Sequence, residues 1–191
     1  MRRGLWILAG IGLVAVLVIG LTQTGQKASR APARSFDLAT AQRKLAGAPK
    51  PLAGIYAQAN RLLGGPPAFE RRLLSLRGHP VVVNKWASWC GPCRAEFPVF
   101  QRVAAARGTT IAFLGLNGKD KAPAARKFLA AEPLPYPSYQ DPDEVVAGRL
   151  EIPGYYPMTV FLDAHGKTRF IHTGEYTSEA QLSRDIDRYL G

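Results

Sequence analysis

Cysteine is scarce in this sequence: only two occur among 191 residues, which excludes a disulfide-rich scaffold. Two thiols are also too few for a zinc site built from cysteine alone. The three histidines, His79, His165 and His172, do not form the closely spaced pair that a mixed Cys/His zinc site requires. We therefore expect no metal site.

Acidic residues are also few. The sequence has 14 Asp and Glu but 25 Lys and Arg, which gives a net charge of +11. A basic chain is a candidate for nucleic-acid binding. Lys and Arg nevertheless never occur here in runs longer than two, whereas nucleic-acid sites need clustered basic side chains. We expect no nucleic-acid partner. The hydrophobic fraction of 47% excludes a disordered chain and suits one folded domain with attachments.

Residues 5–21 are almost wholly apolar, and no acidic residue precedes Asp37. As a helix, these 17 residues would extend about 26 Å, near the lower limit for crossing a bilayer and longer than the apolar core of a usual signal peptide. Arg2 and Arg3 favour keeping residues 1–4 in the cytoplasm. We expect an uncleaved transmembrane signal anchor rather than a cleaved signal peptide, with the large part of the chain after it outside the cytoplasm.

The segment after this anchor divides into a tether and a helical extension. Residues 22–34 are polar, basic and small, as in a flexible linker. Within residues 35–68, the apolar spacing predicts helices at 37–45 and 51–63. The glycine and proline pairs at 64–67 are expected to end the second helix.

Residues 69–191 predict a different organisation, in which strands alternate with helices. The last two strands flank a short turn and favour an antiparallel hairpin, and Asp120 and Ser178 are suitable helix N-caps. This order predicts an α/β domain with helices on both faces of a mixed sheet. The expected strands are 81–87, 109–116, 136–139, 158–162 and 168–172, and the expected helices are 93–104, 122–131, 143–150 and 179–190.

The motif Trp89-Cys90-Gly91-Pro92-Cys93 lies where the first of these strands meets its helix. Thiols at this spacing, at a helix start, can close a small disulfide ring. The helix N-terminus favours a thiolate at Cys90, which is the form that attacks a disulfide, and Cys93 is placed to attack the resulting mixed disulfide. Pro92 stiffens the turn, and Trp89 shields one side of it. A purely structural disulfide is the alternative, although so short a ring removes little chain entropy.

The sequence around this motif, VNKWASWCGPCRAEFP at residues 83–98, closely resembles the active-site segment of the TlpA/ResA/CcmG group. Members of that group are membrane-tethered, thioredoxin-fold thiol–disulfide oxidoreductases of bacteria. A second segment, GYYPMTVFLD at residues 154–163, resembles the cis-proline strand of the same group. The resemblance covers residues 69–191 and implies a thioredoxin-like domain with a central strand–helix insertion near residues 136–150.

The resemblance also implies roles for residues outside the motif. Pro157 would be the cis-proline that faces the cysteines, and Tyr156 would offer its backbone to an extended substrate. Glu96 matches an acidic residue of the group, and a buried carboxyl with a raised pKa there would shuttle a proton during thiol exchange. The alternative for Glu96 is a solvated acid that stabilises the start of the helix. The expected substrate-contact residues are Trp89, Gly91, Pro92 and Tyr156.

Four residues show where this sequence agrees with the narrower group and where it differs from the residues usual there. Asn84 stands where thioredoxins proper carry a buried aspartate, and the TlpA-like group commonly has Asn there. Lys85 replaces a usual aromatic residue, and its ammonium is expected either to reach solvent or to stabilise a thiolate. Tyr156 is bulkier than the residues common before the cis-proline, which would restrict substrates. Met158 stands where cytochrome-maturation members often carry an acid, which argues against specificity for apocytochrome c.

Together these features predict a membrane-anchored, extracytoplasmic thiol–disulfide oxidoreductase that reduces disulfides in exported proteins through its CGPC dithiol. Gly-Pro between the cysteines favours a reducing potential, nearer that of thioredoxin than that of DsbA. The resemblance implies a CcdA-like membrane thiol transporter as the source of electrons, cytochrome c maturation as one setting, and no dissociable cofactor. Two alternatives stay open: a disulfide-forming oxidase or thiol peroxidase of the same fold, and a non-enzymatic anchored binding module.

Overall fold

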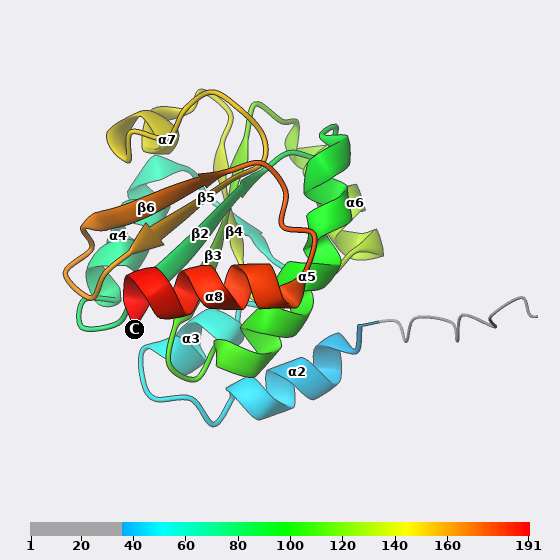
Figure 1. The fold of residues 1–191 in the computed structure, drawn as a ribbon. Coiled ribbons are helices and arrows are strands. Elements are labelled where there is room, and N and C mark those ends of the chain that lie inside the picture. The colour runs from blue at the N-terminus through cyan, green and yellow to red at the C-terminus, as the bar shows by residue number, and fades with distance from the viewer. Residues whose placement is uncertain (1–35) are drawn as a thin grey trace, which may run out of the picture. The chain divides into compact units, whose positions relative to one another are not determined.

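A mixed six-stranded sheet forms the centre of residues 36–191, the part of the chain that the computed structural model describes (Figure 1). Its strand order is β1-β4-β3-β2-β5-β6, in which the first four are parallel and the last two run antiparallel to their neighbours. The predicted mixed sheet is therefore confirmed. The strands are β1 Leu62–Leu63, β2 Val81–Trp86, β3 Ala112–Gly118, β4 Ser138–Asp141, β5 Met158–Leu162 and β6 Thr168–Thr173.

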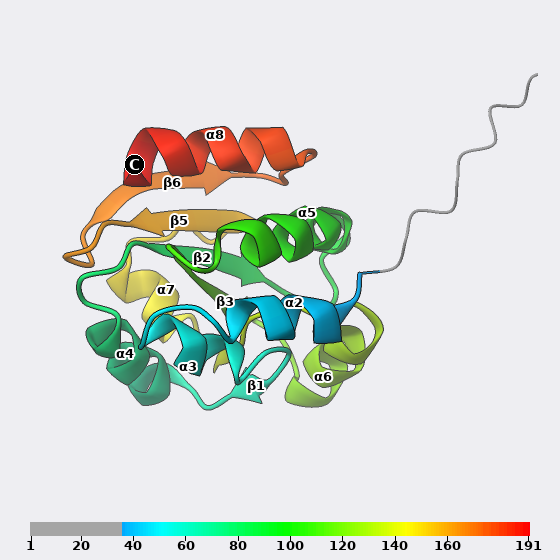
Figure 2. The ribbon, with the colours of Figure 1, turned by 90° about the horizontal axis from the view of Figure 1, so that it is seen from below.

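Helices cover both faces of this sheet, as the sequence pattern predicts. Crossover connections between parallel strands are right-handed. Helices α5 and α6, which lead successively from β2 to β3 and β4, therefore lie on one face, and α4, which leads back from β1 to β2, lies on the other. Helices α2 and α8 pack against α5, whereas α7 packs against α4, and Figure 2 shows α4 and α7 on the side of the strands opposite α5. The helices are α2 Leu38–Leu45, α3 Leu52–Tyr56, α4 Pro66–Ser75, α5 Gly91–Arg107, α6 Ala122–Ala131, α7 Val145–Arg149 and α8 Glu179–Leu190.

Strand β2 lies inside the sheet and positions the cysteine motif, which follows it directly. All its residues are buried, because helices cover the sheet on both faces. At its C-terminal end Trp86 packs against Phe97 of α5 and Phe128 of α6, with ring centroids 5.2 Å and 5.6 Å away. The Trp86 indole N–H also donates to Ser138 Oγ of β4 at 3.1 Å. These contacts hold the end of β2 against the two helices that border the motif.

Residues 51–63 do not form the single helix that the spacing predicts. Helix α3 ends at Tyr56, and Leu62–Leu63 form the edge strand β1, which pairs in parallel with β4. Between them Asn60 adopts a left-handed backbone with φ 60°, a conformation that asparagine tolerates, and its side-chain oxygen accepts the Leu134 N–H at 3.1 Å. Pairing with β4 therefore overrides a spacing that is helical only locally.

The proline pair after β1 begins a helix instead of ending one. Helix α4 starts at Pro66, because proline fits the first helical turn, and it runs across residue 69, where the resemblance begins. Residues 36–191 form one compact unit, to which α2 and α3 belong. Within it the buried Tyr56 hydroxyl of α3 donates to the Ile111 carbonyl at 2.7 Å. The extension is therefore packed into the core.

The remaining elements match their predictions apart from shifts of a few residues at their ends, and the expected insertion segment forms β4 and α7. Asp120 is not the N-cap of α6, which begins after Lys121 without a side-chain cap. The Asp120 carboxylate instead accepts hydrogen bonds from the N–H and the hydroxyl of Ser88, at 2.6 Å and 2.9 Å. This partnership spans 32 residues and depends on the tertiary fold. Asp141, by contrast, is a local partner of α7, since its carboxylate accepts the Val146 and Ala147 N–H groups five and six residues further along the chain.

Among residues 36–191, no helix combines the length and the apolar character that crossing a bilayer requires. The predicted anchor at 5–21 and the tether at 22–34 lie outside the described residues.

Candidate active site

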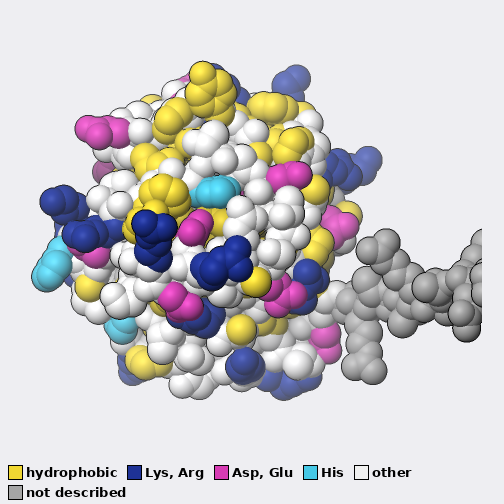
Figure 3. All heavy atoms as spheres, viewed as in Figure 1, with side chains coloured by type: hydrophobic (Ala, Val, Ile, Leu, Met, Phe, Trp, Pro, Cys, Tyr) yellow, Lys and Arg dark blue, Asp and Glu magenta, His cyan; other side chains and the backbone are white. Residues whose placement is uncertain are grey.

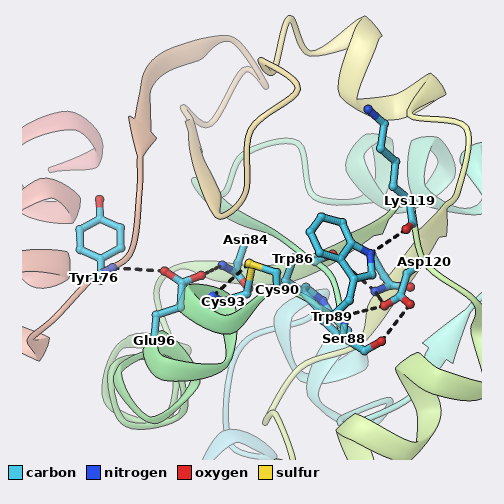
Figure 4. The surroundings of a disulfide bond; sticks show 11 residues. Asn84, Trp86, Ser88, Trp89, Cys90, Cys93, Glu96, Lys119, Asp120 and Tyr176 are labelled. Atoms are coloured by element: carbon cyan, nitrogen blue, oxygen red, sulfur yellow. Dashed lines mark hydrogen bonds between the residues drawn. A yellow bond between two sulfur atoms is a disulfide. The ribbon is translucent and has the colours of Figure 1, made fainter.

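The two cysteines form a disulfide at the start of α5, as the spacing allows (Figure 4). Cys90 is the N-cap of this helix, and its sulfur accepts the Cys93 N–H at 3.2 Å. Only 4% of Cys90 and none of Cys93 is exposed, whereas Gly91 and Pro92 between them are exposed. A reactant that approaches this turn therefore reaches the Cys90 sulfur before the Cys93 sulfur.

Trp89 and Tyr156 form an aromatic wall beside this turn. Their ring centroids are 5.2 Å apart, and the Trp89 side chain is 59% exposed. The Trp89 indole N–H donates to the Lys119 carbonyl at 2.8 Å. In the view of Figure 4, Trp89 lies on one side of the disulfide and Glu96 on the other. The fold thus brings together the cysteine motif and the cis-proline segment, which are far apart in the sequence.

The Tyr156–Pro157 peptide bond is cis, as the resemblance implies. Pro157 is buried and precedes β5, whose first residue, Met158, pairs with Lys85 near the end of β2. The Pro157 carbonyl accepts the Gly174 N–H at 3.1 Å, whereas no backbone hydrogen bond joins Tyr156 to another residue of the described part. The peptide groups of Tyr156 are therefore available to an added strand.

Glu96 lies inside the protein, one helical turn beyond Cys93. Its side chain is fully buried, so the alternative of a solvated first-turn acid is wrong. Its Oε1 accepts the Asn84 side-chain N–H at 2.6 Å, and its Oε2 accepts the Tyr176 backbone N–H at 3.2 Å. Burial raises the pKa of Glu96 to about 8, against the opposing effect of these two hydrogen bonds.

Asn84 is suited to both protonation states of Glu96. Its amide N–H donates to the carboxylate, while its Oδ1 is buried without a partner in the described part of the chain. Rotation of the amide would turn Oδ1 toward Glu96, where it can accept a hydrogen bond from the protonated carboxyl group. An aspartate at this position could not donate to ionised Glu96 and would add a second buried charge.

Lys85 is also fully buried, so the expectation that its ammonium group reaches solvent is wrong. The Lys85 Nζ lies 2.5 Å from Glu144 Oε1, donates to the Pro153 carbonyl at 3.1 Å and stands 4.2 Å from the centre of the Tyr156 ring. Glu144 Oε1 also accepts the Tyr156 hydroxyl at 2.8 Å, and Glu144 Oε2 lies 2.8 Å from Lys119 Nζ. We call Lys85, Lys119, Glu144 and Tyr156 the Glu144 cluster.

Sequence reasoning missed Glu144, which precedes α7 and is one of several acids in its segment. The only signal was indirect, because a lysine on a buried strand needs an anionic partner. Burial would raise the pKa of Glu144, but its hydrogen bonds with Lys119, Lys85 and Tyr156 outweigh that effect and lower the pKa to about 2. Glu144 is therefore a fixed negative charge at the edge of the site.

Of the three histidines, His172 lies nearest to a proposed site residue, because it contacts Tyr176, whose backbone N–H binds Glu96. His172 of β6 stacks on Tyr176, with ring centroids 4.1 Å apart, and its Nδ1 is 3.7 Å from an Asp185 oxygen. Burial lowers the pKa of His172, against the attraction of Asp185. Within residues 36–191, no three His, Cys, Asp or Glu side chains gather in a way that could hold a metal ion.

The fold and its dithiol place this protein in the class of thioredoxin-fold thiol–disulfide oxidoreductases, as the sequence predicts. The chain belongs to the AhpC/TSA family, whose sequence profile matches residues 69–171. Relatives named DsbE and ResA confirm the resemblance to the TlpA/ResA/CcmG group.

Three named relatives illustrate the similarity. The thiol:disulfide interchange protein DsbE of Pseudomonas fluorescens biotype C is 37% identical over 126 residues, which cover 60% of this chain and 68% of the relative. The thiol-disulfide oxidoreductase ResA of Geobacillus kaustophilus is 30% identical over 122 residues, 63% of this chain and 67% of the relative. The soluble secreted antigen MPT53 of Mycobacterium tuberculosis is 33% identical over 98 residues, which span 51% of this chain and only 56% of that protein.

Solved structures show the same architecture. A DsbE-type thiol:disulfide interchange protein from Chlorobium tepidum superposes with a TM-score of 0.57 at 30% identity, covering 62% of this chain and 85% of the other. A secreted disulfide oxidoreductase of Mycobacterium tuberculosis superposes with a TM-score of 0.54 at 29% identity, covering 60% of this chain and 85% of the other. The thioredoxin-like fold predicted from the sequence is confirmed.

Proposed function

We propose that this protein reduces disulfides of exported proteins outside the cytoplasm, through the dithiol of Cys90 and Cys93. The observation that carries the proposal is the position of Cys90 at the N-terminus of α5, behind an exposed Gly91-Pro92 turn and beside the aromatic wall. The helix terminus and the Cys93 N–H both stabilise a thiolate at this sulfur.

The reaction takes place in two exchange steps. The Cys90 thiolate attacks one sulfur of the client disulfide, so that a Cys90–client disulfide forms and the other client sulfur leaves as a thiolate. Cys93 then attacks the Cys90 sulfur, which forms the Cys90–Cys93 disulfide and releases the second client thiolate. The client gains two electrons and the protein loses two.

Glu96 is proposed to accept the proton of the Cys93 thiol before the second step and to return it when the protein is reduced again. Three features support this role: its place one turn beyond Cys93, its complete burial, and a pKa of about 8. That pKa lies near the usual thiol value of about 8.5, so the proton can move in either direction with little driving force.

Tyr156 and Pro157 are proposed to bind the client segment that carries the disulfide. The unpaired peptide groups of Tyr156 support addition of an extended client strand, which would place its sulfur at Cys90. Trp89, Gly91 and Pro92 would contact the side chains next to the client cysteine, because they are exposed around the same turn.

A reductant that works outside the cytoplasm must be reduced again after each turnover. We propose a CcdA-like membrane thiol transporter as the electron source, with the apolar segment 5–21 as the anchor that keeps this protein near it. The names of two relatives describe secreted proteins, which supports a location outside the cytoplasm. Cytochrome c maturation is one setting for such a reductant.

Replacement of Cys93 tests the exchange mechanism. In cells of the native host, Cys93→Ala leaves Cys90 able to attack but removes the thiol that releases the client. We expect disulfide-linked complexes between Cys90 and exported proteins to accumulate, and mass spectrometry after non-reducing separation identifies the clients.

The control is Cys90→Ala, which should trap nothing. An absence of complexes in the Cys93→Ala strain would overturn the exchange mechanism and favour an anchored binding module. A mainly oxidised Cys90–Cys93 pair in unaltered cells, measured by thiol alkylation, would instead indicate a disulfide-forming oxidase.

A further inference from the structure

The aromatic wall is held by side chains that come from separate parts of the chain. Tyr156 precedes β5, Lys85 is the last residue but one of β2, Lys119 follows β3 and Glu144 precedes α7. The Glu144 carboxylate is the common partner, because it contacts Lys85, Lys119 and the Tyr156 hydroxyl at once. The Lys119 backbone carbonyl in turn accepts the Trp89 indole N–H. One carboxylate thus connects both aromatic rings of the wall.

Two residues of this arrangement have an unfavourable backbone conformation. Lys119 and Glu144 both adopt left-handed backbones, with φ 46° and 55°, which disfavour residues with a side chain. Gly118 lies against the hydroxyl end of Tyr156, since a Cβ at this position would stand 2.3 Å from the Tyr156 hydroxyl oxygen. The segments around Lys119 and Glu144 are therefore shaped to meet each other and Tyr156.

The surface around the wall carries several exposed apolar side chains. The large hydrophobic side chains that stand exposed in this region are Trp89, Val145 and Tyr155, and Figure 3 shows hydrophobic side chains gathered at the end of the molecule where α7 lies. Glu144 itself is only 17% exposed, so its charge is directed to its partners rather than to the client. A client segment with an apolar side chain beside its cysteine would fit this surface.

We propose that Glu144 is a positioning residue that fixes Tyr156 and Trp89 beside Cys90, and that this fixed aromatic wall makes the protein selective for extended peptide disulfides with an apolar neighbour. The inference rests on the proposed function, since it assumes that clients bind along Tyr156. A rigid wall loses little entropy when a client binds, whereas freed rings would have to be ordered at each encounter.

The simpler explanation is that Glu144 only neutralises the buried Lys85 charge and supports the fold. The two explanations differ in one measurable respect. A purely structural role affects every reaction of the dithiol through stability, whereas a positioning role affects peptide disulfides and spares small reagents that do not touch the wall.

The test uses the purified full-length chain and the variants Glu144→Ala and Tyr156→Phe. Single-turnover reduction of a disulfide peptide with an aromatic residue next to its cysteine gives a half-saturating concentration and a limiting rate. For Glu144→Ala we expect the half-saturating concentration to rise about tenfold, and for Tyr156→Phe about threefold, with nearly unchanged limiting rates. For Tyr156→Phe, which keeps every charge of the site, the rate at which dithiothreitol reduces the Cys90–Cys93 disulfide, and the reduction potential of this disulfide, should not change.

Tyr156→Phe keeps the Lys85–Glu144 ion pair, so it tests the hydroxyl contact even where Glu144→Ala fails to fold. The matched control is Glu151→Ala, an exposed acid with the same left-handed backbone, which should leave all values unchanged. If the variants lose as much activity toward dithiothreitol as toward the peptide, the inference is overturned. It is also overturned if both variants bind the peptide as the unaltered protein does. In either case the proposed function itself still stands. Failure of the unaltered protein to reduce the peptide would overturn the proposed function and this inference with it.

Discussion

At the scale of single residues, Glu96 shows how a buried carboxyl group, here proposed to carry a proton, weakens the fold around it. The carboxyl group has an ordinary pKa of 4.5 and a pKa of about 8 in the folded protein, because burial disfavours its charge. Between these two values the unfolded chain has lost the proton while the folded protein still holds it. The free energy of unfolding therefore falls as the pH rises through this range.

The variant Glu96→Gln should remove this pH dependence. Glutamine stays neutral, and its amide can donate to the free Asn84 Oδ1 while its oxygen accepts the Tyr176 N–H. One pKa unit corresponds to about 1.4 kcal/mol, so the variant should gain several kcal/mol of stability relative to the unaltered protein between about pH 5 and about pH 8.

Urea unfolding of the disulfide form at both pH values measures the difference. Glu151→Gln serves as the exposed control and should follow the unaltered protein. Parallel stability curves for Glu96→Gln and the unaltered protein would show that Glu96 does not titrate in this range.

At the scale of elements, the contact between β3 and β4 decides how the end of β2 is held. Gly115 of β3 pairs with Ser138 of β4, and the Ser138 hydroxyl accepts the Trp86 indole N–H. A Cβ at Gly115 would stand 2.1 Å from that hydroxyl oxygen and 3.0 Å from the indole nitrogen. The glycine is therefore required by close packing behind the active site.

Replacement of this glycine should damage the fold more than most single methyl additions. We expect Gly115→Ala to destabilise the protein by about 2–4 kcal/mol, because the added methyl group overlaps buried atoms that cannot move away. The thermal midpoint of the disulfide form checks this value.

Gly148→Ala is the matched control, since a Cβ at this position in α7 meets no atom within 4 Å. It should be neutral or stabilising by up to about 1 kcal/mol, because alanine is the better helix former. Equal midpoints for the two variants would contradict the packing argument.

At the scale of the whole molecule, residues 36–68 belong to the core of the protein. Their fully buried side chains Leu45, Leu52, Ile55 and Tyr56 join the same hydrophobic cluster as the central strand. Each such side chain contributes about 1.5–3 kcal/mol on burial, and a domain is stable by only about 5–15 kcal/mol. The sheet also loses its edge strand β1 without this segment.

A chain that begins at residue 69 should therefore fail to fold cooperatively, whereas a chain that begins at Phe36 should unfold in one transition. Circular dichroism during thermal unfolding distinguishes the two. The prediction is contradicted by a chain from residue 69 with the same midpoint as the longer one.

The sequence by itself determined the local features of this protein. Strand β2, helices α6 and α8, the β5–β6 hairpin and the placement of Cys90 at a helix start follow from short-range periodicity, turn residues and caps. These signals act over a few residues, and in these elements the tertiary contacts agree with them. The resemblance added the cis bond before Pro157 and pointed to Glu96.

The tertiary structure alone decided which distant residues become partners. Leu62–Leu63 became a strand because β4 offered free backbone groups, and Asp120 bonded to Ser88 instead of capping α6. Lys85 stayed buried because Glu144 reached it from the segment before α7. Such pairings depend on the distance between segments that are far apart along the chain, and residue types or their local spacing do not contain that distance.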